Sequence, residues 1–368
     1  MKVLIIGGAG FIGSHTADEL DRRGYEIVIF DNISSKTHSD GGWPEYLKPQ
    51  YEKIAGDVRD KEALSKSLRG VDYVVHLAAQ MDLMPDYSVF FDTNVTPTAY
   101  IYECIIKEKL PIKKVVVASS QFVYGEGRWQ CPKDGIVLPN IRTTEQLEKK
   151  QWEPLCPVCQ GKITPKENLE THQDPPNQYA ISKYSQELIA LRLGRLNNIP
   201  SVAMRYSIVH GPRQSIKNAY SGALRIFTMQ LLSGLDLSIY EDGMSQRDYV
   251  SVYDVARANA TVLEDERANY ENFNVGSGKA YTVLDLAEFI AKHLGKKTKL
   301  KANGQFRVGD IRHAVSSIEK LKNLSWMPQL GEDEVVKEYI EWIKTQTIEV
   351  SYVQEAQEKL KKSGIVRG

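Results

Sequence analysis

Short apolar runs alternate with segments of helical periodicity through the first half of the chain. Each apolar run is rich in Val, Ile or Leu and is followed by a glycine or polar turn. Near-continuous apolar strands that alternate with helices are typical of a parallel sheet covered by helices on both faces. The pattern therefore predicts an α/β fold. The predicted strands are 3–6, 27–30, 73–77, 115–118 and 201–205, and the predicted helices are 13–22, 93–108 and 182–196.

The alternation breaks between residues 126 and 176. This segment has Gly, Pro, Cys, Lys and Gln in irregular order without a sustained period, which indicates an insertion with its own small fold. Beyond about residue 211 the segments are shorter and mixed, and residues 350–362 have the pattern of a charged helical tail. We expect a first domain over 1–200 that carries the module 126–176, and a smaller mixed α/β lobe over 201–368 that is partly interleaved with it.

Composition narrows the class of protein. The 368 residues suggest about two domains. Lys and Arg number 47 against 47 Asp and Glu, and such a balance argues against nucleic acid as the main partner. We see no membrane-length apolar stretch and no export signal at the N-terminus, so we expect a cytoplasmic protein. Four cysteines in a chain of this length do not form a disulfide scaffold.

A glycine-rich turn follows the first predicted strand and opens the first predicted helix. Its glycines, Gly7, Gly10 and Gly13, would let the backbone approach a pyrophosphate, whose charge the helix N-terminus stabilises. Asp31 ends the second predicted strand, where it would accept hydrogen bonds from ribose hydroxyls and repel a 2′-phosphate. The pattern favours an NAD site over an NADP site. The alternative is a structural glycine turn beside a surface Asp.

A second group of residues points to acid–base chemistry. Tyr179 and Lys183 are four positions apart, which places them on one face of a helix. A Lys ammonium beside the phenol favours the phenolate, so Lys183 should lower the pKa of Tyr179 and make it a general acid/base. Ser120 follows a predicted strand, at the sheet edge where ligands of open α/β folds bind. The alternative interpretation is a Tyr and a Lys on a solvated helix face.

Several further motifs occur in order along the chain. Together with the two groups above they resemble the extended short-chain dehydrogenase/reductases, and specifically the nucleotide-sugar epimerases and dehydratases, which implies a Rossmann-type doubly wound parallel sheet. The segments 207–209 and 218–222 and the insertion look more like dTDP-L-rhamnose 4-epimerase-type proteins than like UDP-galactose 4-epimerases, which leaves the base and the sugar open. The motifs are Asp57-Val58, His76 to Gln80, Asn94, Arg205-Tyr206, His210 to Gln214, Arg247 to Val250 with Asp254, and Arg307 to Asp310.

The resemblance implies tightly bound NAD and a nucleotide-diphosphate sugar as the substrate. The resemblance implies that Arg247 and Arg307 bind the diphosphate. A planar guanidinium group can bind two phosphate oxygens at once, which agrees with this role. The alternative for each arginine is a surface ion pair. The implied NAD-site residues are Gly7, Gly10, Phe11, Ile12, Gly13, Asp31, Asn32, Asp57, Val58, Leu77, Ala78, Ala79, Gln80, Asn94, Tyr179 and Lys183. The implied substrate-site residues are Ser120, Gln121, Arg213, Asn218, Arg247, Arg307 and Asp310.

Phe122 discriminates among the reactions of this family. By the resemblance, dehydratases and decarboxylases carry Glu two positions after the catalytic Ser or Thr, and enzymes that epimerise beside a keto group carry Cys there. Phe122 moves no proton. We therefore expect a 4-epimerase, in which Ser120, Tyr179 and Lys183 support oxidation of the C4 hydroxyl to a transient ketone and its reduction on the other face. The alternatives are a 4-ketoreductase or dehydrogenase with net redox change, and a non-catalytic NAD-binding scaffold.

The insertion carries three cysteines in two short turns. Cys131 and the pair Cys156 and Cys159 resemble the two knuckles of a zinc ribbon, each of which presents two ligands to a tetrahedral metal. The first turn has Asp134 where a second Cys or His is usual, so Asp134 or His172 would be the fourth ligand of a structural zinc. The alternatives are metal-free turns with reduced thiols and a Cys156–Cys159 redox pair.

The resemblance also implies a homodimer joined through two helices per subunit. These helices correspond to residues 94–107 and 182–195 of this chain. The sequence itself contributes only their apolar faces. No membrane or nucleic-acid partner is expected.

Overall fold

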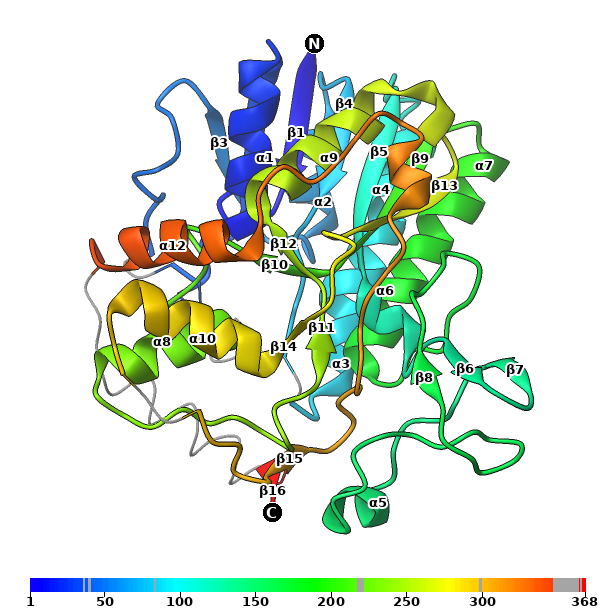
Figure 1. Cartoon of the computed structure of the whole chain (residues 1–368). Helices are drawn as coiled ribbons and strands as arrows, with labels where there is room; N and C mark the ends of the chain where they lie inside the picture. Colours follow the sequence, from blue (N-terminus) through cyan, green and yellow to red (C-terminus); the bar gives the residue numbers. More distant parts are fainter. Residues whose placement is uncertain are drawn as a thin grey trace.

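A seven-stranded parallel sheet forms the centre of the larger part of the molecule and takes strands from both halves of the chain (Figure 1). The computed structural model describes residues 1–35, 37–38, 41–82, 84–216, 222–297, 300–346, 364 and 366–368. All neighbouring strands are parallel, in the order β13-β9-β5-β4-β1-β2-β3. The predicted strands are confirmed, each within two residues of its predicted ends. The strands are β1 (Lys2–Ile6), β2 (Glu26–Asp31), β3 (Glu52–Ala55), β4 (Tyr73–His76), β5 (Lys114–Ser120), β9 (Ser201–Tyr206) and β13 (Glu271–Val275).

Helices cover both faces of this sheet, as the apolar pattern predicts. Alternate residues of β1 enter different cores because successive side chains of a strand point to opposite faces. Val3 and Ile5 pack in the core under α1 and α9, whereas Leu4 and Ile6 pack in the core under α2 and α4. The covering helices are α1 (Phe11–Arg22), α2 (Lys61–Leu68), α4 (Thr96–Lys107) and α9 (Val252–Glu264).

Two of the predicted helices are longer and less regular than their patterns suggest. The predicted helix 182–196 begins earlier, because the side chain of Asn177 accepts a hydrogen bond from Ala180 N at 3.0 Å and so caps the helix. Both helices contain a π-helical turn. The first consists of α3 (Tyr87–Phe90), η1 (Phe91–Val95) and α4, and the second of α6 (Gln178–Leu188), η3 (Ile189–Leu193) and α7 (Gly194–Leu196).

The second lobe lies below the sheet in Figure 1 and encloses its own apolar core between α8, α10 and α12. Because β9, β13 and α9 return to the large sheet, the two parts of the chain are interleaved. The predicted tail 350–362 lies outside the described residues. The helices of the lobe are α8 (Ala223–Leu232), α10 (Val283–Leu294) and α12 (Glu332–Ile343), whereas η4 (Glu266–Ala268) and α11 (Glu319–Lys322) pack in the core of the large sheet. The strand pairs are β10 (Ile208–His210) with β12 (Tyr249–Ser251), β11 (Gln246–Arg247) with β14 (Tyr281–Thr282), and β15 (Phe306–Arg307) with β16 (Val366–Arg367).

The insertion forms a separate small module, at the lower right of Figure 1. It begins just after the 3-10 turn η2 (Gln121–Tyr124) and contains an antiparallel sheet in the order β7-β6-β8. Its elements are β6 (Trp129–Cys131), β7 (Gly135–Val137), α5 (Thr144–Glu148) and β8 (Thr164–Pro165). Across the described ranges, we find no helix with the length and apolar character needed to cross a membrane.

Candidate functional site

The structure brings Ser120, Tyr179 and Lys183 to the carboxyl end of β5. Ser120 is the last residue of that strand, and its side chain lies close enough to Tyr179 to lower the pKa of the phenol. Lys183, one helical turn further along α6, donates from Nζ to the carbonyl oxygen of Ala118 at 3.0 Å. Lys183 is buried, whereas Tyr179 is partly exposed. The phenol is therefore the more accessible of these two groups.

The electrostatics of this group differ from the prediction. Desolvation raises the pKa of Tyr179 to about 12, and the side chain of Ser120 opposes only part of that rise. Desolvation also lowers the pKa of Lys183 to about 7. The expectation that Lys183 lowers the pKa of Tyr179 is therefore wrong for the chain alone, because burial penalises both charged forms. A further positive charge near the phenol would be needed to favour the phenolate.

Gln121 and Phe122, which follow Ser120 in the chain, also belong to the candidate site. The ring of Phe122 meets the ring of Tyr179 edge-on, with 6.4 Å between the ring centroids. The side chain of Gln121 is buried, and neither its amide nitrogen nor its amide oxygen has a hydrogen-bond partner within the described chain. An unpaired buried amide is costly, so Gln121 is suited to bind a polar ligand at this position.

The glycine turn packs against the end of β4 with no room for side chains. A Cβ on Gly7, whose φ is +81°, would lie 2.5 Å from the backbone nitrogen of Ala78. A Cβ on Gly13 would lie 2.2 Å from the carbonyl oxygen of Gly7. Both positions therefore require glycine, and the backbone at the N-terminus of α1 is left open for a pyrophosphate. This cradle fits the dinucleotide that the sequence predicts.

Asp31 connects this turn to the end of β2. One of its carboxylate oxygens accepts a hydrogen bond from Ala9 N at 3.1 Å, and the other accepts one from Ile33 N at 3.0 Å. Each oxygen keeps a second lone pair, which suits the predicted contact with a ribose. Next to it, Asn32 donates to Asp57 at 3.3 Å, and hydrogen bonds from Arg59 lower the pKa of Asp57 to about 2.

Asn94 lies close to these residues, but its own hydrogen bonds are made within the protein. Its side chain accepts from Gln80 N at 2.7 Å and donates to the carbonyl oxygen of Gln80 at 3.1 Å and to the hydroxyl of Ser182 at 2.8 Å. The asparagine thus fixes the 77–80 loop against α6. In this structure Asn94 positions the 77–80 loop, which is part of the predicted NAD site.

The two predicted phosphate arginines have different surroundings. Arg247 is held in place, because its guanidinium donates to the carbonyl oxygens of Gln246, Ile311 and Arg312 and to Asp310 at 2.8–3.4 Å. Arg307 lies over the ring of Tyr240, 5.0 Å from its centroid. Its Nε is buried and has no hydrogen-bond partner among the described residues. Arg307 therefore has donor capacity for an anionic ligand.

Other predicted site residues are used differently or cannot be placed. Arg213 donates to Asp18 at 2.8 Å and stacks over Tyr46, beside the glycine turn. Asn218 lies outside the described residues. The ring of His172 packs 5.1 Å from that of Tyr124 and is absent from the cysteine cluster, so His172 is wrong as a fourth metal ligand.

Sequence reasoning missed the contacts that join the insertion to the second lobe. The side chain of Arg142 is fully buried and binds Glu126 at 3.0 Å and Glu241 at 2.9 Å. It also donates to the carbonyl oxygen of Asp310 at 3.0 Å. An isolated arginine in an irregular segment has no sequence signal that separates it from a surface residue.

Comparisons with known proteins agree with this geometry. Residues 3–150 and 156–276 match the model of the NAD-dependent epimerase/dehydratase family. The chain is 33% identical to a dTDP-L-rhamnose 4-epimerase of Burkholderia thailandensis, over 93% of this chain and 94% of the relative. It is 31% identical to a putative UDP-glucose 4-epimerase of Methanocaldococcus jannaschii, over 93% and 98%. A UDP-glucose 4-epimerase of Thermus thermophilus, solved with NAD, superposes with a TM-score of 0.75 at 26% identity, over 94% of this chain and 100% of that one.

Proposed function

Since the chain belongs to the NAD-dependent epimerase/dehydratase family, we propose that it is an NAD-dependent nucleotide-sugar 4-epimerase. The observation that carries the proposal is the neighbouring pair Ser120 and Tyr179, which lies with Lys183 at the carboxyl end of β5. This position is where open α/β sheets bind their ligands. The glycine cradle at the end of β1 supports the use of a dinucleotide.

In the proposed complex, each side chain has a defined task. Gly7, Gly13 and Asp31 hold NAD, which when bound accepts a hydride from the sugar and returns it. Tyr179 takes the proton of the C4 hydroxyl and later gives it back to the same oxygen. Ser120 donates a hydrogen bond to that oxygen. General acid–base catalysis of this kind contributes about 10²–10⁴-fold in rate.

The nucleotide diphosphate is proposed to lie between the sheet edge and the second lobe. Arg307 supports this placement, because its buried Nε lacks a partner in the described chain. Arg247 adds positive charge from a guanidinium held rigidly by three carbonyl groups and Asp310. Rigid arginines lose little entropy when they bind a phosphate. Gln121 would contact the sugar, and Asn218 is proposed as a further substrate contact by resemblance alone.

Phe122 favours epimerisation over elimination or decarboxylation. In the dehydratases and decarboxylases that the chain resembles, a Glu occupies this position. The phenyl ring of Phe122 instead packs against Tyr179 and supplies no acid or base near the sugar. A ketoreductase with net redox change is the nearest alternative, and it would change the absorbance of the cofactor stoichiometrically. A non-catalytic scaffold is disfavoured because the Ser–Tyr–Lys group is complete.

We propose a homodimer in the cytoplasm as the working form. The paired segments α4 and α6–η3 carry apolar side chains at the surface, among them Ile106 (43% exposed) and Leu188 (38% exposed). A dimer joined through these helices would cover such exposed apolar side chains. We also propose that the insertion binds one structural zinc ion, which takes no part in the chemistry at C4. The domain boundary near residue 200 stays a prediction.

The experiment that tests the function is incubation of the purified protein with UDP-, dTDP-, GDP- and CDP-sugars. Proton NMR identifies a product inverted at C4, and the absorbance at the NADH band is followed in parallel. An epimerase converts at least one sugar to its C4 epimer without a net change in absorbance. Conversion that consumes or forms NADH would identify a ketoreductase, and binding without turnover of any sugar would revive the scaffold.

A further inference from the structure

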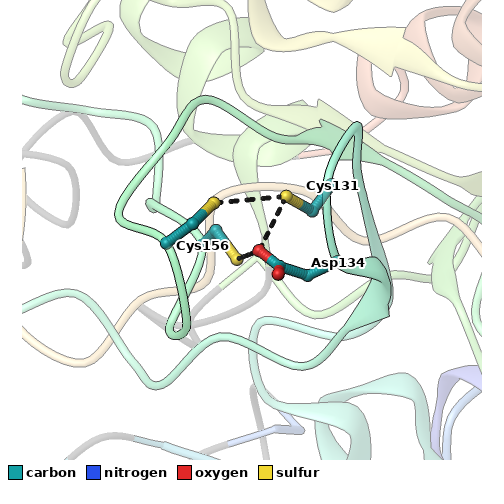
Figure 2. Close-up of side chains that lie close together, drawn as sticks. Cys131, Asp134 and Cys156 are labelled. Carbon is teal, nitrogen blue, oxygen red and sulfur yellow. Dashed lines mark hydrogen bonds between the residues drawn. The ribbon is translucent and has the colours of Figure 1, made fainter.

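Three cysteines and one aspartate of the insertion converge on a single point. Figure 2 shows Cys131, Asp134 and Cys156 directed toward one another; the first two belong to one loop and Cys156 to another. The sulfur of Cys131 is 3.2 Å, and that of Cys156 3.1 Å, from the same oxygen of Asp134. The sulfurs of Cys131 and Cys159 are 3.5 Å apart, and all four potential ligand atoms lie within 4.8 Å of one another.

The two turns that supply these side chains have the same construction. In each, a Cys is followed by Pro, one further residue and then the second potential ligand. The next residue has a positive φ in both turns, +75° at Gly135 and +59° at Gln160. Gln160 adopts this left-handed conformation although it is not glycine, which costs free energy that the surrounding structure must offset. The two turns therefore repeat one backbone design that aims side chains at a common centre.

The apolar core of the insertion is too small to explain why these two turns have a fixed conformation. It consists of Trp129, Cys131, Val137, Cys156 and Ile163, so that two of its five buried members are cysteines. All four cysteines of the chain are free thiols in the structure. Small modules that lack a sufficient apolar core depend on disulfides or a metal. In this module the cysteines are arranged around Asp134 instead of being paired.

We infer that Cys131, Asp134, Cys156 and Cys159 form a closed four-ligand site for a divalent metal ion of the zinc type, and that this ion fixes the fold of the insertion, which in turn contacts the substrate lobe. In a tetrahedral zinc site the Zn–S distance of about 2.3 Å places sulfurs about 3.8 Å apart, and the observed separations need only small shifts to match. Binding releases the three thiol protons to solvent, while Asp134 binds as the carboxylate.

The burial of the ligands agrees with such a site. Cys131 and Cys156 are buried, Cys159 is half-buried and Asp134 is exposed, so an ion can enter from the surface on the side of Asp134. His172 lies against Tyr124 and does not complete the set. Four protein ligands leave no open position for a substrate, which makes the role structural.

The other side of the insertion holds the segment that positions Arg247. Arg142 donates to the carbonyl oxygen of Asp310 at 3.0 Å, and Glu126 accepts from Arg312 N at 2.9 Å. Arg247 donates to the carbonyl oxygen of Arg312 at 2.8 Å. The insertion and Arg247 thus form hydrogen bonds with the same segment, residues 310–312. This role of the ion rests on the proposed function, because Arg247 is assigned there to the substrate diphosphate.

The metal site is tested on the full-length protein, purified without chelators from cells supplied with zinc. We expect about one zinc ion per chain by elemental analysis. Asp134→Ala and Cys156→Ser should lose it, His172→Gln should keep it, and Asp134→Cys should bind zinc at least as tightly as the parent. Cobalt added to the metal-stripped protein should give thiolate charge-transfer bands and tetrahedral d–d bands. Absence of zinc, a Cys131–Cys159 disulfide, or unchanged zinc affinity in both Asp134 variants would overturn the site.

The role of the ion in ordering the insertion is tested by removing the metal from the parent protein. We expect KM for an epimerised nucleotide sugar to rise about tenfold or more, with kcat changed much less and NAD retained. An unchanged KM in a protein that has lost its zinc would contradict this role while leaving the site intact. If zinc binds but no nucleotide sugar is epimerised, the proposed function fails and the metal site stands.

Discussion

The side chain of Ser120 lies close enough to Tyr179 to lower the pKa of its hydroxyl, although the whole insertion separates the two residues along the chain. Their meeting point is the carboxyl end of β5, where Lys183 is also anchored through the carbonyl oxygen of Ala118. The insertion therefore leaves the catalytic geometry intact. It projects from the same edge of the sheet and packs on the second lobe instead.

Replacement of Tyr179 by Phe should abolish turnover without unfolding the protein. The ring and its contact with Phe122 remain, and only the proton-carrying hydroxyl is lost. We expect kcat to fall about 10²–10⁴-fold while NAD stays bound. The matched control is Tyr184→Phe on the same helix, which should keep parent activity. Parent-level kcat in the Tyr179 variant would show that another group moves the proton.

The pKa of Tyr179 should depend on the charge of the bound cofactor. In the chain alone, desolvation raises it to about 12, so the phenolate forms only in strong alkali. Bound NAD would supply the positive charge of its nicotinamide, which would favour the phenolate of Tyr179, whereas NADH, with a neutral ring, would not. The phenolate absorbance near 295 nm, taken as parent minus Tyr179→Phe, should therefore rise at lower pH with NAD than with NADH. Equal midpoints would argue against this electrostatic coupling.

The glycine cradle makes a steric prediction. In Gly7→Ala the new Cβ would meet the backbone nitrogen of Ala78 at 2.5 Å, and the residue would be strained at φ +81°. We expect loss of NAD from the purified protein together with a lower Tm, because the turn and the 77–80 loop must separate. Gly42→Ala is the control, since its Cβ would meet nothing within 4 Å. A Gly7→Ala protein that retains NAD would contradict the proposed cradle.

Arg307 should act on binding more than on chemistry. Loss of one charge-assisted hydrogen bond to a phosphate, worth about 1.5–3 kcal/mol, corresponds to a KM raised about 10- to 100-fold in Arg307→Ala. We expect kcat to stay within about twofold of the parent, because the diphosphate is bound equally in ground and transition states. Arg267→Ala serves as a control, because Arg267 is exposed and paired with Asp265. A fall in kcat with unchanged KM would place Arg307 elsewhere in the reaction.

Much of the first domain could be predicted from the sequence, because burial on both faces leaves uninterrupted apolar runs. The five predicted strands lie within two residues of their predicted ends, whereas β3 and β13 carry polar residues and were not among them. The start of α6 was missed because it depends on the Asn177 cap, which precedes the apolar pattern. The π-helical turns in both long helices leave no periodic signal.

The candidate site also contains residues that the sequence predicts and contacts that it does not. Local motifs located Gly7, Asp31 and Tyr179, since their chemistry depends on short-range spacing. Contacts between distant segments could not be predicted, as with Arg142, which reaches Asp310 and Glu241 across the lobe boundary. The pKa of Tyr179 also needed the structure, because desolvation depends on burial by residues far away in the sequence.

Label retention at C4 tests the central claim most directly. A nucleotide sugar that the protein converts is prepared with deuterium at C4, and the product is examined by NMR and mass spectrometry after several turnovers. A 4-epimerase that returns the same hydride from its resident cofactor predicts a C4-inverted product with the deuterium still at C4 and none exchanged with solvent. Loss of deuterium from C4, or solvent hydrogen incorporated at C3 or C5, would contradict the account.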